Sequence, residues 1–418
     1  MSDTVDAAAL DAILASIFLT PEGKADPYPG YAEVREATPL HHSNLGVLVS
    51  ARYDDCNAIL RDNHFGKGTF DFDPSIFGLT QAEFDERFPH SNDFNGSMLA
   101  MDPPDHTRLR GLVAKAFTPK TVKELEPKIH DLTDGFLAPL EGDVDVMSAL
   151  ALKLPITVIS EMLGVPSADH DALLPHIRIL LRTLAQFSPP SIEEFSENYV
   201  ASNVVGDYFR DLAADKRAHP DDGMFTQLVH AEEEGDKLTE GELISTILLI
   251  FVAGYETTTN LIGNGLRALL LNPDQLQKLR DDRGLMKTAV EEMLRYDSPV
   301  QLTGRQVLAD GVEVAGEPVE KGTEIITLLG AANRDPRTYD EPDRFDVARP
   351  GPAPLSFSAG IHYCLGAALA RAEGHIVFGS LLDRYSTIEP AWTDDAPPAY
   401  RDSLVLRGLE SLPVRLLP

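Results

Sequence analysis

Apolar residues recur three and four positions apart through much of the chain between Thr107 and about Arg295, the spacing of one face of an α-helix. The clearest such runs are Leu125–Leu137, Ala149–Leu163, Val200–Leu212 and Leu276–Leu294. Strand patterns are short: one at Val47–Val49, and brief alternating runs between Arg305 and Leu328 that Gly-containing turns interrupt. We therefore expect a mainly α-helical protein with small β-sheets.

One helix is predicted to be much longer than the others. Thr239 and Glu242 form a capping box and Pro273 ends the pattern. A helix from about Glu240 to Leu271 would be roughly 48 Å long at a rise of 1.5 Å per residue.

The middle of this long helix changes character abruptly. A strongly apolar run gives way to Gly254, Glu256 and three threonines, Thr257–Thr259. Glycine and threonines that hydrogen-bond to the preceding turn weaken and bend a helix. Two interpretations are open: a buried helix whose polar patch reaches the surface, or a functional site.

The chain loses regular periodicity after Asn333 for about thirty residues, and an irregular segment of this length inside a compact domain is usually functional. Its prolines are Pro336, Pro342, Pro350, Pro352 and Pro354. There is no solenoid repeat and no low-complexity tract. We expect a single domain over residues 1–418.

A cysteine follows this segment at the point where a loop enters a helix. The loop reads Phe-Ser-Ala-Gly-Ile-His-Tyr-Cys-Leu-Gly over residues 357–366, and a helical run begins at Ala367. The positive end of the helix dipole favours the thiolate of Cys364, which can bind a metal or attack an electrophile. Glycines on both sides would let a large flat ligand approach the backbone.

Two other interpretations of Cys364 are open. A lone cysteine in a cytosolic protein is most often buried and inert. A Cys-His hydrolase would use His362, but residues two positions apart on a loop rarely reach nucleophile and base geometry.

Composition limits the classes of function. The chain has 36 Lys and Arg against 66 Asp and Glu, a formal charge of −30, so nucleic acids and anionic membranes would be repelled. Two cysteines are too few for a disulfide scaffold or a multi-cysteine zinc site, and they suit a reducing compartment. The N-terminus lacks the pattern of a signal peptide. The longest apolar run, Ile247–Gly254, is far shorter than the roughly 20 residues of a membrane span, so we expect a cytoplasmic protein.

The loop at residues 357–366 resembles the haem-binding loop of the cytochrome P450 family, Phe-x-x-Gly-x-His-x-Cys-x-Gly. All five fixed positions match. Ser358 departs from the family, which usually has glycine there.

Three further stretches resemble the same family, in the same order along the chain. Residues 292–295 match its Glu-x-x-Arg helix, and Arg344 matches the arginine that completes its ion triad with Glu292 and Arg295. Residues 253–257 match the Ala-Gly-x-Asp/Glu-Thr element of the long central helix. His106 and Arg110 resemble a pair that binds haem propionates. The resemblance covers essentially the whole chain.

The resemblance implies the cytochrome P450 fold, with haem b buried between the long central helix and the helix that follows the cysteine. Cys364 would ligate the iron, and Phe357 would keep water from the sulfur. Gly360 and Gly366 would belong to the haem-binding residues and let the flat haem approach the backbone. It assigns the propionates to His106, Arg110, Arg305 and His362.

The resemblance also assigns the catalytic residues. Ala253 and Gly254 would open a notch beside the iron, Thr257 would bind O2 by a hydrogen bond, and Glu256 with water would relay protons. Glu292, Arg295 and Arg344 would be structural. The implied activity is a haem-thiolate monooxygenase that inserts one oxygen atom of O2 into a hydrophobic molecule.

Electrons must come from another protein, because the chain has no flavin or nicotinamide fingerprint. We expect an acidic ferredoxin with its NAD(P)H-dependent reductase. A basic segment, His106–Lys128, would suit this partner. It holds six basic side chains and two acidic ones: Arg108, Arg110, Lys115, Lys120, Lys123 and Lys128, with Glu124 and Glu126.

The distribution of aromatic residues indicates the kind of substrate. Seven of the 18 phenylalanines lie between Phe65 and Phe94, in the segment that lines the pocket in the family. A second variable region, Ile177–Tyr199, is Leu-rich and broken by Pro189 and Pro190. These features favour a fatty or branched lipid or a terpenoid. A polyketide or macrolide scaffold is the alternative, as are a peroxide-driven oxygenase and, in another class, a haem sensor without turnover.

Overall fold

The computed structural model describes residues 6–68, 73–89, 97–184, 190–221, 223–233 and 236–418. It is mainly helical with small β-sheets, as the sequence predicts. Its internal contacts divide the chain into two compact units: unit 1, formed by Met1–Gly66, Glu124–Leu154 and Thr257–Pro418, and unit 2, formed by Lys67–Lys123 and Pro155–Glu256. The expectation of a single domain stays a prediction.

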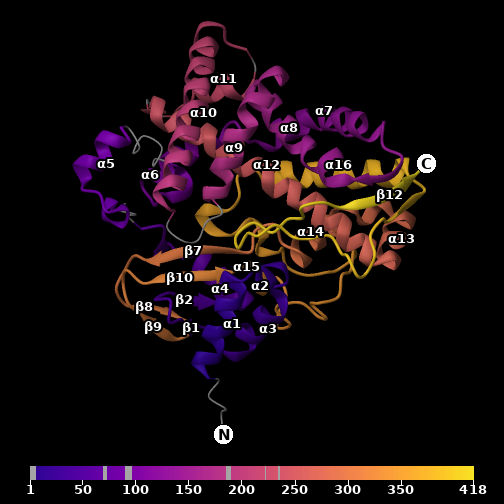
Figure 1. The fold of residues 1–418 in the computed structure, drawn as a ribbon, viewed down its shortest axis with the longest axis horizontal. Helices are drawn as coiled ribbons and strands as arrows, with labels where there is room; N and C mark the ends of the chain where they lie inside the picture. Colours follow the sequence, from indigo (N-terminus) through magenta and orange to yellow (C-terminus); the bar gives the residue numbers. More distant parts are fainter. Residues whose placement is uncertain (1–5, 69–72, 90–96, 185–189, 222, 234–235) are drawn as a thin grey trace. The chain divides into compact units, whose positions relative to one another are not determined.

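Unit 1 is built around a five-stranded sheet with the strand order β1-β2-β10-β7-β3. The strands are β1 (His41–His42), β2 (Leu48–Ser50), β3 (Phe65–Gly66), β7 (Leu302–Val307) and β10 (Glu324–Leu328). β10 pairs with β2 in parallel and with β7 antiparallel. In Figure 1 the first helices of the chain lie beside this sheet, and apolar residues of α1 (Ala7–Leu19) and α3 (Tyr28–Ala37) share a core cluster with it.

The other elements of unit 1 are short sheets and helices. A three-stranded sheet has the order β11-β12-β4, and β8 pairs with β9. The strands are β4 (Gly142–Asp145), β8 (Val312–Val314), β9 (Glu317–Val319), β11 (Thr387–Pro390) and β12 (Pro413–Leu417). The remaining helices are α2 (Pro21–Ala25), α4 (Tyr53–Arg61), α13 (Pro273–Asp281), α14 (Met286–Tyr296), α15 (Leu329–Ala332) and α16 (Ala367–Arg384).

In its described residues, unit 2 is helical apart from one two-stranded ribbon. Its elements are α5 (Gln81–Arg87), α6 (Asp105–Ala114), α9 (His170–Leu184), α10 (Ile192–Ala218), α11 (Met224–Val229), β5 (Glu232–Glu233) and β6 (Asp236–Lys237). α10 begins with a capping box formed by Ser191 and Glu194.

Three helices pass from one unit into the other: α7 (Pro119–Leu137), α8 (Lys153–Leu163) and α12 (Glu240–Leu271). α12 has the predicted bounds. It is continuous through Gly254 and Thr257, so the expected weakness does not interrupt the helix. By length and composition α12 is apolar enough to cross a membrane, but 72% of its most apolar window is buried inside the protein, as in the core helix of a soluble protein.

Two predicted helical runs are divided in the structure. The run Ala149–Leu163 begins in a π-helical turn, Met147–Ala151, that precedes α8. The run Leu276–Leu294 forms α13 and α14, with a 3-10 turn, Arg283–Leu285, between them. Asp282 explains the break, because its side chain accepts a hydrogen bond from the backbone N–H of Gly284 at 2.9 Å and so competes with helical bonding.

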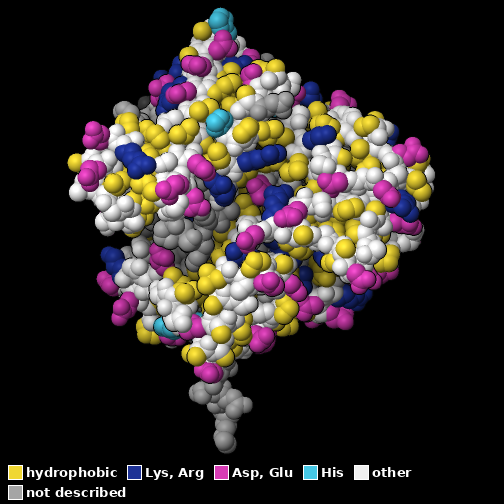
Figure 2. Space-filling model, viewed as in Figure 1, with side chains coloured by type: hydrophobic (Ala, Val, Ile, Leu, Met, Phe, Trp, Pro, Cys, Tyr) yellow, Lys and Arg dark blue, Asp and Glu magenta, His cyan; other side chains and the backbone are white. Residues whose placement is uncertain are grey.

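Acidic side chains are spread over the face shown in Figure 2 rather than collected in one patch.

Candidate functional site

The loop before α16 is anchored to the segment after Asn333 and to the end of α14. The backbone N–H of Leu355 donates to Asn333 Oδ1 at 2.7 Å. The Ser356 hydroxyl donates to the carbonyl of Leu294 at 2.6 Å and accepts a hydrogen bond from Asn333 Nδ2 at 2.9 Å. These buried bonds fix the loop where it enters the site.

Cys364 lies at the end of this loop, three residues before α16. Its side chain is exposed, and its backbone N–H donates to the carbonyl of Phe357 at 2.9 Å, which closes the loop. The other cysteine, Cys56, is fully buried, and burial raises the pKa of its thiol to about 12. The interpretation as an inert buried cysteine therefore fits Cys56 and not Cys364.

The loop contains two residues with positive φ. Ser358 has φ 60° and ψ −165°, a region that only glycine adopts without strain, which accounts for the glycine usual in the resembled family. Gly360 has φ 67°, and a Cβ there would lie 2.2 Å from the carbonyl oxygen of Leu60. Gly360 therefore serves the turn and the approach to α4, and our expectation that its missing side chain makes room for a ligand is wrong. A Cβ on Gly366, by contrast, would meet no atom within 4 Å.

The two predicted cations of unit 1 lie in different elements. Arg305 is in β7 and is 4% exposed, and its Nη1 donates to the carbonyl of Gly304 at 2.9 Å and to Thr303 Oγ1 at 3.2 Å. His362 ends the 3-10 turn Gly360–His362, next to the exposed Tyr363, and is itself partly exposed.

The two predicted cations of unit 2 lie one turn apart on α6. His106 is 2% exposed and Arg110 is partly exposed. Residues four apart share a helix face, so both can serve one ligand. Arg108, between them, forms an ion pair with Glu242 on α12, which neutralises one charge of the basic segment.

The predicted catalytic residues share the partly exposed face of α12. Ala253, Gly254, Glu256 and Thr257 are each partly exposed, whereas most of the helix around them is buried. The next two threonines differ: Thr258 is 3% exposed, and Thr259 is fully buried and donates to the carbonyl of Ala151 at 2.9 Å. Gly254 faces α8, where an added Cβ would make an ordinary van der Waals contact, 3.4 Å from Ile159 Cδ1.

The predicted ion triad has a different third member. Glu292 and Arg295 form a buried pair with N–O distances of 2.6 and 2.9 Å. Arg349 completes the cluster through Nε, at 3.0 and 3.1 Å from the Glu292 carboxylate. The prediction of Arg344 is wrong: its side chain is exposed and pairs with Glu341, and only its carbonyl contacts Arg295, at 3.3 Å.

Phenylalanines of the aromatic-rich segment pack against α10. Adjacent rings have centroids 5.0 to 6.5 Å apart. The cluster consists of Phe77, Phe84, Phe88, Phe195 and Tyr199. For these rings the aromatic enrichment is explained by packing between α5 and α10.

The other residues on which the substrate prediction depends do not belong to this aromatic cluster. Phe65 lies in an apolar core cluster of unit 1. Phe70, Phe72, Phe94 and Pro189 lie outside the described residues. Ile177 in the second variable region is fully buried.

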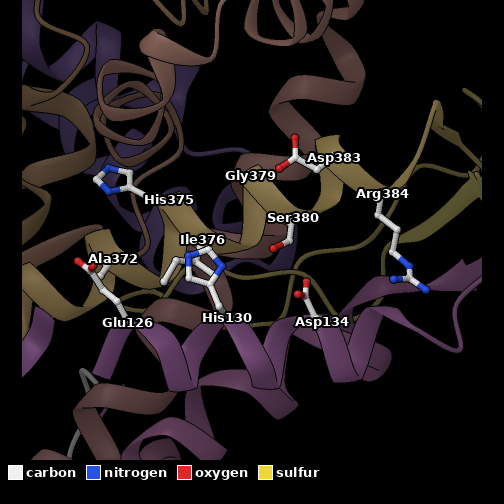
Figure 3. A pocket seen from close by; sticks show the side chains of 10 residues that line it. All are labelled: Glu126, His130, Asp134, Ala372, His375, Ile376, Gly379, Ser380, Asp383 and Arg384. Atoms are coloured by element: carbon white, nitrogen blue, oxygen red, sulfur yellow. The ribbon is translucent and has the colours of Figure 1, made fainter. Parts of the chain in front are cut away.

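A cavity of about 550 Å³ lies in unit 1 between α7 and α16 (Figure 3). His130 points from α7 toward α16, and the lining is mostly polar. The lining residues are Glu126, His130, Asp134, Ala372, His375, Ile376, Gly379, Ser380, Asp383 and Arg384. None of them is a residue predicted for the site, so this cavity is separate from the predicted chemistry.

Two contacts near the site were not predicted from the sequence. Arg349 reaches Glu292 from 57 positions away, and Arg371 reaches Glu291 from 80 positions away. Spacing along the chain carries no signal for such pairs. Only the presence of arginines in the irregular segment and early in α16 could have suggested them.

Comparisons with known proteins agree on one family. A family model for cytochrome P450 matches residues 80–410. Cytochrome P450 107B1 of Saccharopolyspora erythraea is 41% identical over 93% of this chain and 95% of its own length. The polyketide biosynthesis cytochrome P450 PksS of Bacillus subtilis is 37% identical over 96% of this chain and all of its own length. Among solved structures, P450BioI in complex with a hexadec-9Z-enoic acid ligated acyl carrier protein has a TM-score of 0.85 and 35% identity, covering 95% of this chain and 99% of that one.

Proposed function

The chain belongs to the cytochrome P450 family and is a haem-dependent monooxygenase, and we propose that Cys364 holds the haem iron through its sulfur. The observation that carries the proposal is an exposed cysteine three residues before α16, on a loop closed by the cysteine's own backbone hydrogen bond. Thiolate is a ligand that suits haem iron.

The residues present fit haem b. The backbone at Gly366, two residues from the sulfur, faces open space, where a flat macrocycle can approach. The two carboxylates of haem need cations, and we assign them to His106, Arg110, Arg305 and His362. Arginine suits this task because its guanidinium can bind a carboxylate with two hydrogen bonds. Phe357, 8% exposed, would shield the sulfur from water.

Haem, when bound, supplies an iron that activates O2, and a thiolate ligand favours cleavage of the O–O bond. One oxygen atom enters the substrate and the other leaves as water, which takes two electrons from an external donor and two protons that the chain must deliver. We assign this delivery to Thr257 Oγ1 and the Glu256 carboxyl. This assignment is supported by exposure: Glu256 and Thr257 lie on the partly exposed face of α12, whereas Thr258 and Thr259 are buried.

The ligand assignment is tested by comparing the two cysteine variants. Cys364→Ala should abolish the Soret band that marks thiolate ligation in the reduced carbon monoxide complex. Cys56→Ala, the matched control, should retain it. An unaltered spectrum in Cys364→Ala would refute the assignment.

The proton assignment is tested by coupling. Thr257→Ala should consume reducing equivalents without matching product and release peroxide. Thr258→Ala, at the adjacent buried position, should remain coupled. Equal coupling in the two variants would remove Thr257 from the proton path.

We propose a hydrophobic substrate, either a fatty or branched acyl chain or terpenoid, or a polyketide or macrolide. Similarity to P450BioI, solved with a fatty acyl chain on a carrier protein, supports the first group, and similarity to PksS supports the second. The two groups can be separated by titrating the ferric protein with hexadec-9Z-enoic acid, a terpenoid and a macrolide. The substrate-induced shift of the Soret band reports which of these ligands binds.

The electron source and compartment are also proposals. We propose an acidic ferredoxin with its NAD(P)H-dependent reductase, in the cytoplasm. Product formed with this system but not with peroxide alone would support it. Product with peroxide alone would favour a peroxide-driven oxygenase, and no product with either would favour a haem sensor.

A further inference from the structure

Arg371 lies on α16, two turns after Cys364, and contacts three side chains at once. Its guanidinium carbon is 4.4 Å from the centre of the Phe357 ring, and Nη1 lies 3.0 Å from the Tyr363 hydroxyl. Nε and Nη2 bind the Glu291 carboxylate of α14 at 2.5 and 3.1 Å. One arginine therefore joins two helices and two rings of the cysteine loop.

The two rings belong to the residues that define the position of the cysteine backbone. The Phe357 carbonyl accepts the hydrogen bond from the Cys364 N–H, and Tyr363 is bonded directly to Cys364. The rings also contact each other edge to face, with centroids 6.4 Å apart. A group that holds both rings therefore holds both ends of the loop that presents the sulfur.

The chemistry of arginine suits this position. A guanidinium can stack on an aromatic face and bind a carboxylate with two hydrogen bonds at the same time, which lysine cannot do. The side chains of Arg371 and Glu291 are 24% and 32% exposed, so the pair is partly shielded from water. Burial alone would lower the pKa of Arg371, but hydrogen bonds to Glu291 and Tyr363 raise it above its ordinary value, so the guanidinium stays charged.

We propose that Arg371, anchored by Glu291, is a positioning residue that clamps Phe357 and Tyr363 and so holds the Cys364 sulfur in place for iron ligation. This inference rests on the role proposed for Cys364. It predicts that loosening the clamp weakens retention of the thiolate before it weakens the fold.

The test compares ligand loss with global unfolding in the haem-loaded protein. Both are measured under mild denaturant. Decay of the thiolate-type Soret band of the reduced carbon monoxide complex gives the rate of ligand loss, and far-UV circular dichroism gives the rate of unfolding. Loss of the ring contact and of the charge-assisted bonds in Arg371→Met should speed the decay of the Soret band about tenfold, with a much smaller change in unfolding rate.

Two further variants and a control sharpen the result. Arg371→Lys keeps the charge but not the stacking or the paired bonds, and should also lose the thiolate faster. Glu291→Gln removes only the anchor and should speed thiolate loss by less than Arg371→Met does. Arg384→Met removes an arginine at the far end of the same helix, beside the Tyr385 ring, and should change nothing (Figure 3).

Each outcome decides the inference. Faster ligand loss in Arg371→Lys and Glu291→Gln supports it even if Arg371→Met fails to retain haem. Unchanged ligand loss in these two variants, or ligand loss that accelerates only in step with unfolding, overturns it. If the wild-type protein itself lacks the thiolate-type band, the role of Cys364 fails and the inference falls with it. A normal wild-type band with unchanged variants refutes Arg371 alone.

Discussion

Ser358 is a strained residue inside the loop that carries the cysteine. Its φ of 60° and ψ of −165° lie in a region that costs a residue with a Cβ about 1 to 3 kcal/mol. Glycine adopts this conformation freely but loses more entropy on folding. We expect Ser358→Gly to raise the free energy of unfolding by about 1 kcal/mol, measured by denaturant unfolding of the haem-loaded protein.

The neighbouring position provides the control. Ala359 has an extended backbone, φ −149°, and is 2% exposed, so glycine there relieves no strain and removes a buried methyl group. Ala359→Gly should therefore be destabilising. If the two variants shift stability in the same direction, strain at Ser358 is not the cause.

Glu373 on α16 gives a prediction about pH. Its side chain is 2% exposed, and its Oε2 atom has no hydrogen-bond partner among the described residues. Burial raises the pKa of this carboxyl from 4.5 to about 8. Between these values the folded state holds a proton that the unfolded state has released, so stability should fall with rising pH by about 1.4 kcal/mol per pH unit.

Glutamine cannot ionise, so Glu373→Gln removes this pH dependence. The melting temperature of the variant should approach or exceed that of the wild type as pH rises from 6 to about 8, and the difference should level off above that. Melting curves by circular dichroism at several pH values measure it. A difference that does not change with pH would show that Glu373 does not titrate in this range.

Local sequence was enough to locate the cysteine loop but not to explain all of its residues. The order of residues 357–366 placed Cys364 correctly before α16, because a glycine-containing turn followed by a helical run is a local pattern. The reason for Gly360 could not be read locally, since it depends on the Leu60 carbonyl, which lies far away in the chain.

At the scale of elements, the cluster around Glu292 joins α14 to the irregular segment. Glu292 also accepts the backbone N–H of Asp346 at 2.8 Å, so its carboxylate organises several residues of that segment. Its side chain is 1% exposed and that of Arg349 is 10% exposed. Removing Arg349 leaves Glu292 paired with Arg295. It also removes the Arg349 hydrogen bonds to this carboxylate and to the carbonyls of Asp340, Glu341 and Arg344, and a hydrogen bond to a charged group is worth about 1.5 to 3 kcal/mol.

The structure therefore predicts a sharp contrast between two nearby arginines. Arg349→Gln should destabilise the protein by several kcal/mol or prevent haem uptake, and Arg344→Gln should change stability by less than about 0.5 kcal/mol, because its pair with Glu341 is exposed. Urea unfolding measures both. Equal effects would contradict the assignment of Arg349 to the cluster.

The difference between Arg344 and Arg349 also shows which features of the elements the sequence could not predict. Helix periodicity and the capping box gave α12 its observed bounds, because both signals are local. The choice between Arg344 and Arg349 depends on the course of a loop without periodicity, and sequence spacing does not determine which side chain turns inward.

At the scale of the whole molecule, the charge of −30 affects how the chain would meet the acidic ferredoxin that we propose as its electron donor. Long-range repulsion opposes the approach of a ferredoxin, so docking needs a local basic surface. Arg108 contributes little to such a surface because it is paired with Glu242. Lys120 and Lys123, at the start of α7, are the better candidates because both are exposed, whereas Arg108 is only partly exposed.

We expect the variant Lys120→Glu/Lys123→Glu to be reduced by an acidic ferredoxin about tenfold more slowly at low salt, because opposite charges mainly speed association. Stopped-flow measurement of haem reduction gives the rate. The deficit should shrink at high salt, where the Debye length falls to about 3 Å at 1 M. Lys321→Glu, an exposed lysine in the turn between β9 and β10, makes a similar change elsewhere and should have little effect. If Lys321→Glu slows reduction as much as the pair does, the partner senses net charge, and the start of α7 is not a docking surface.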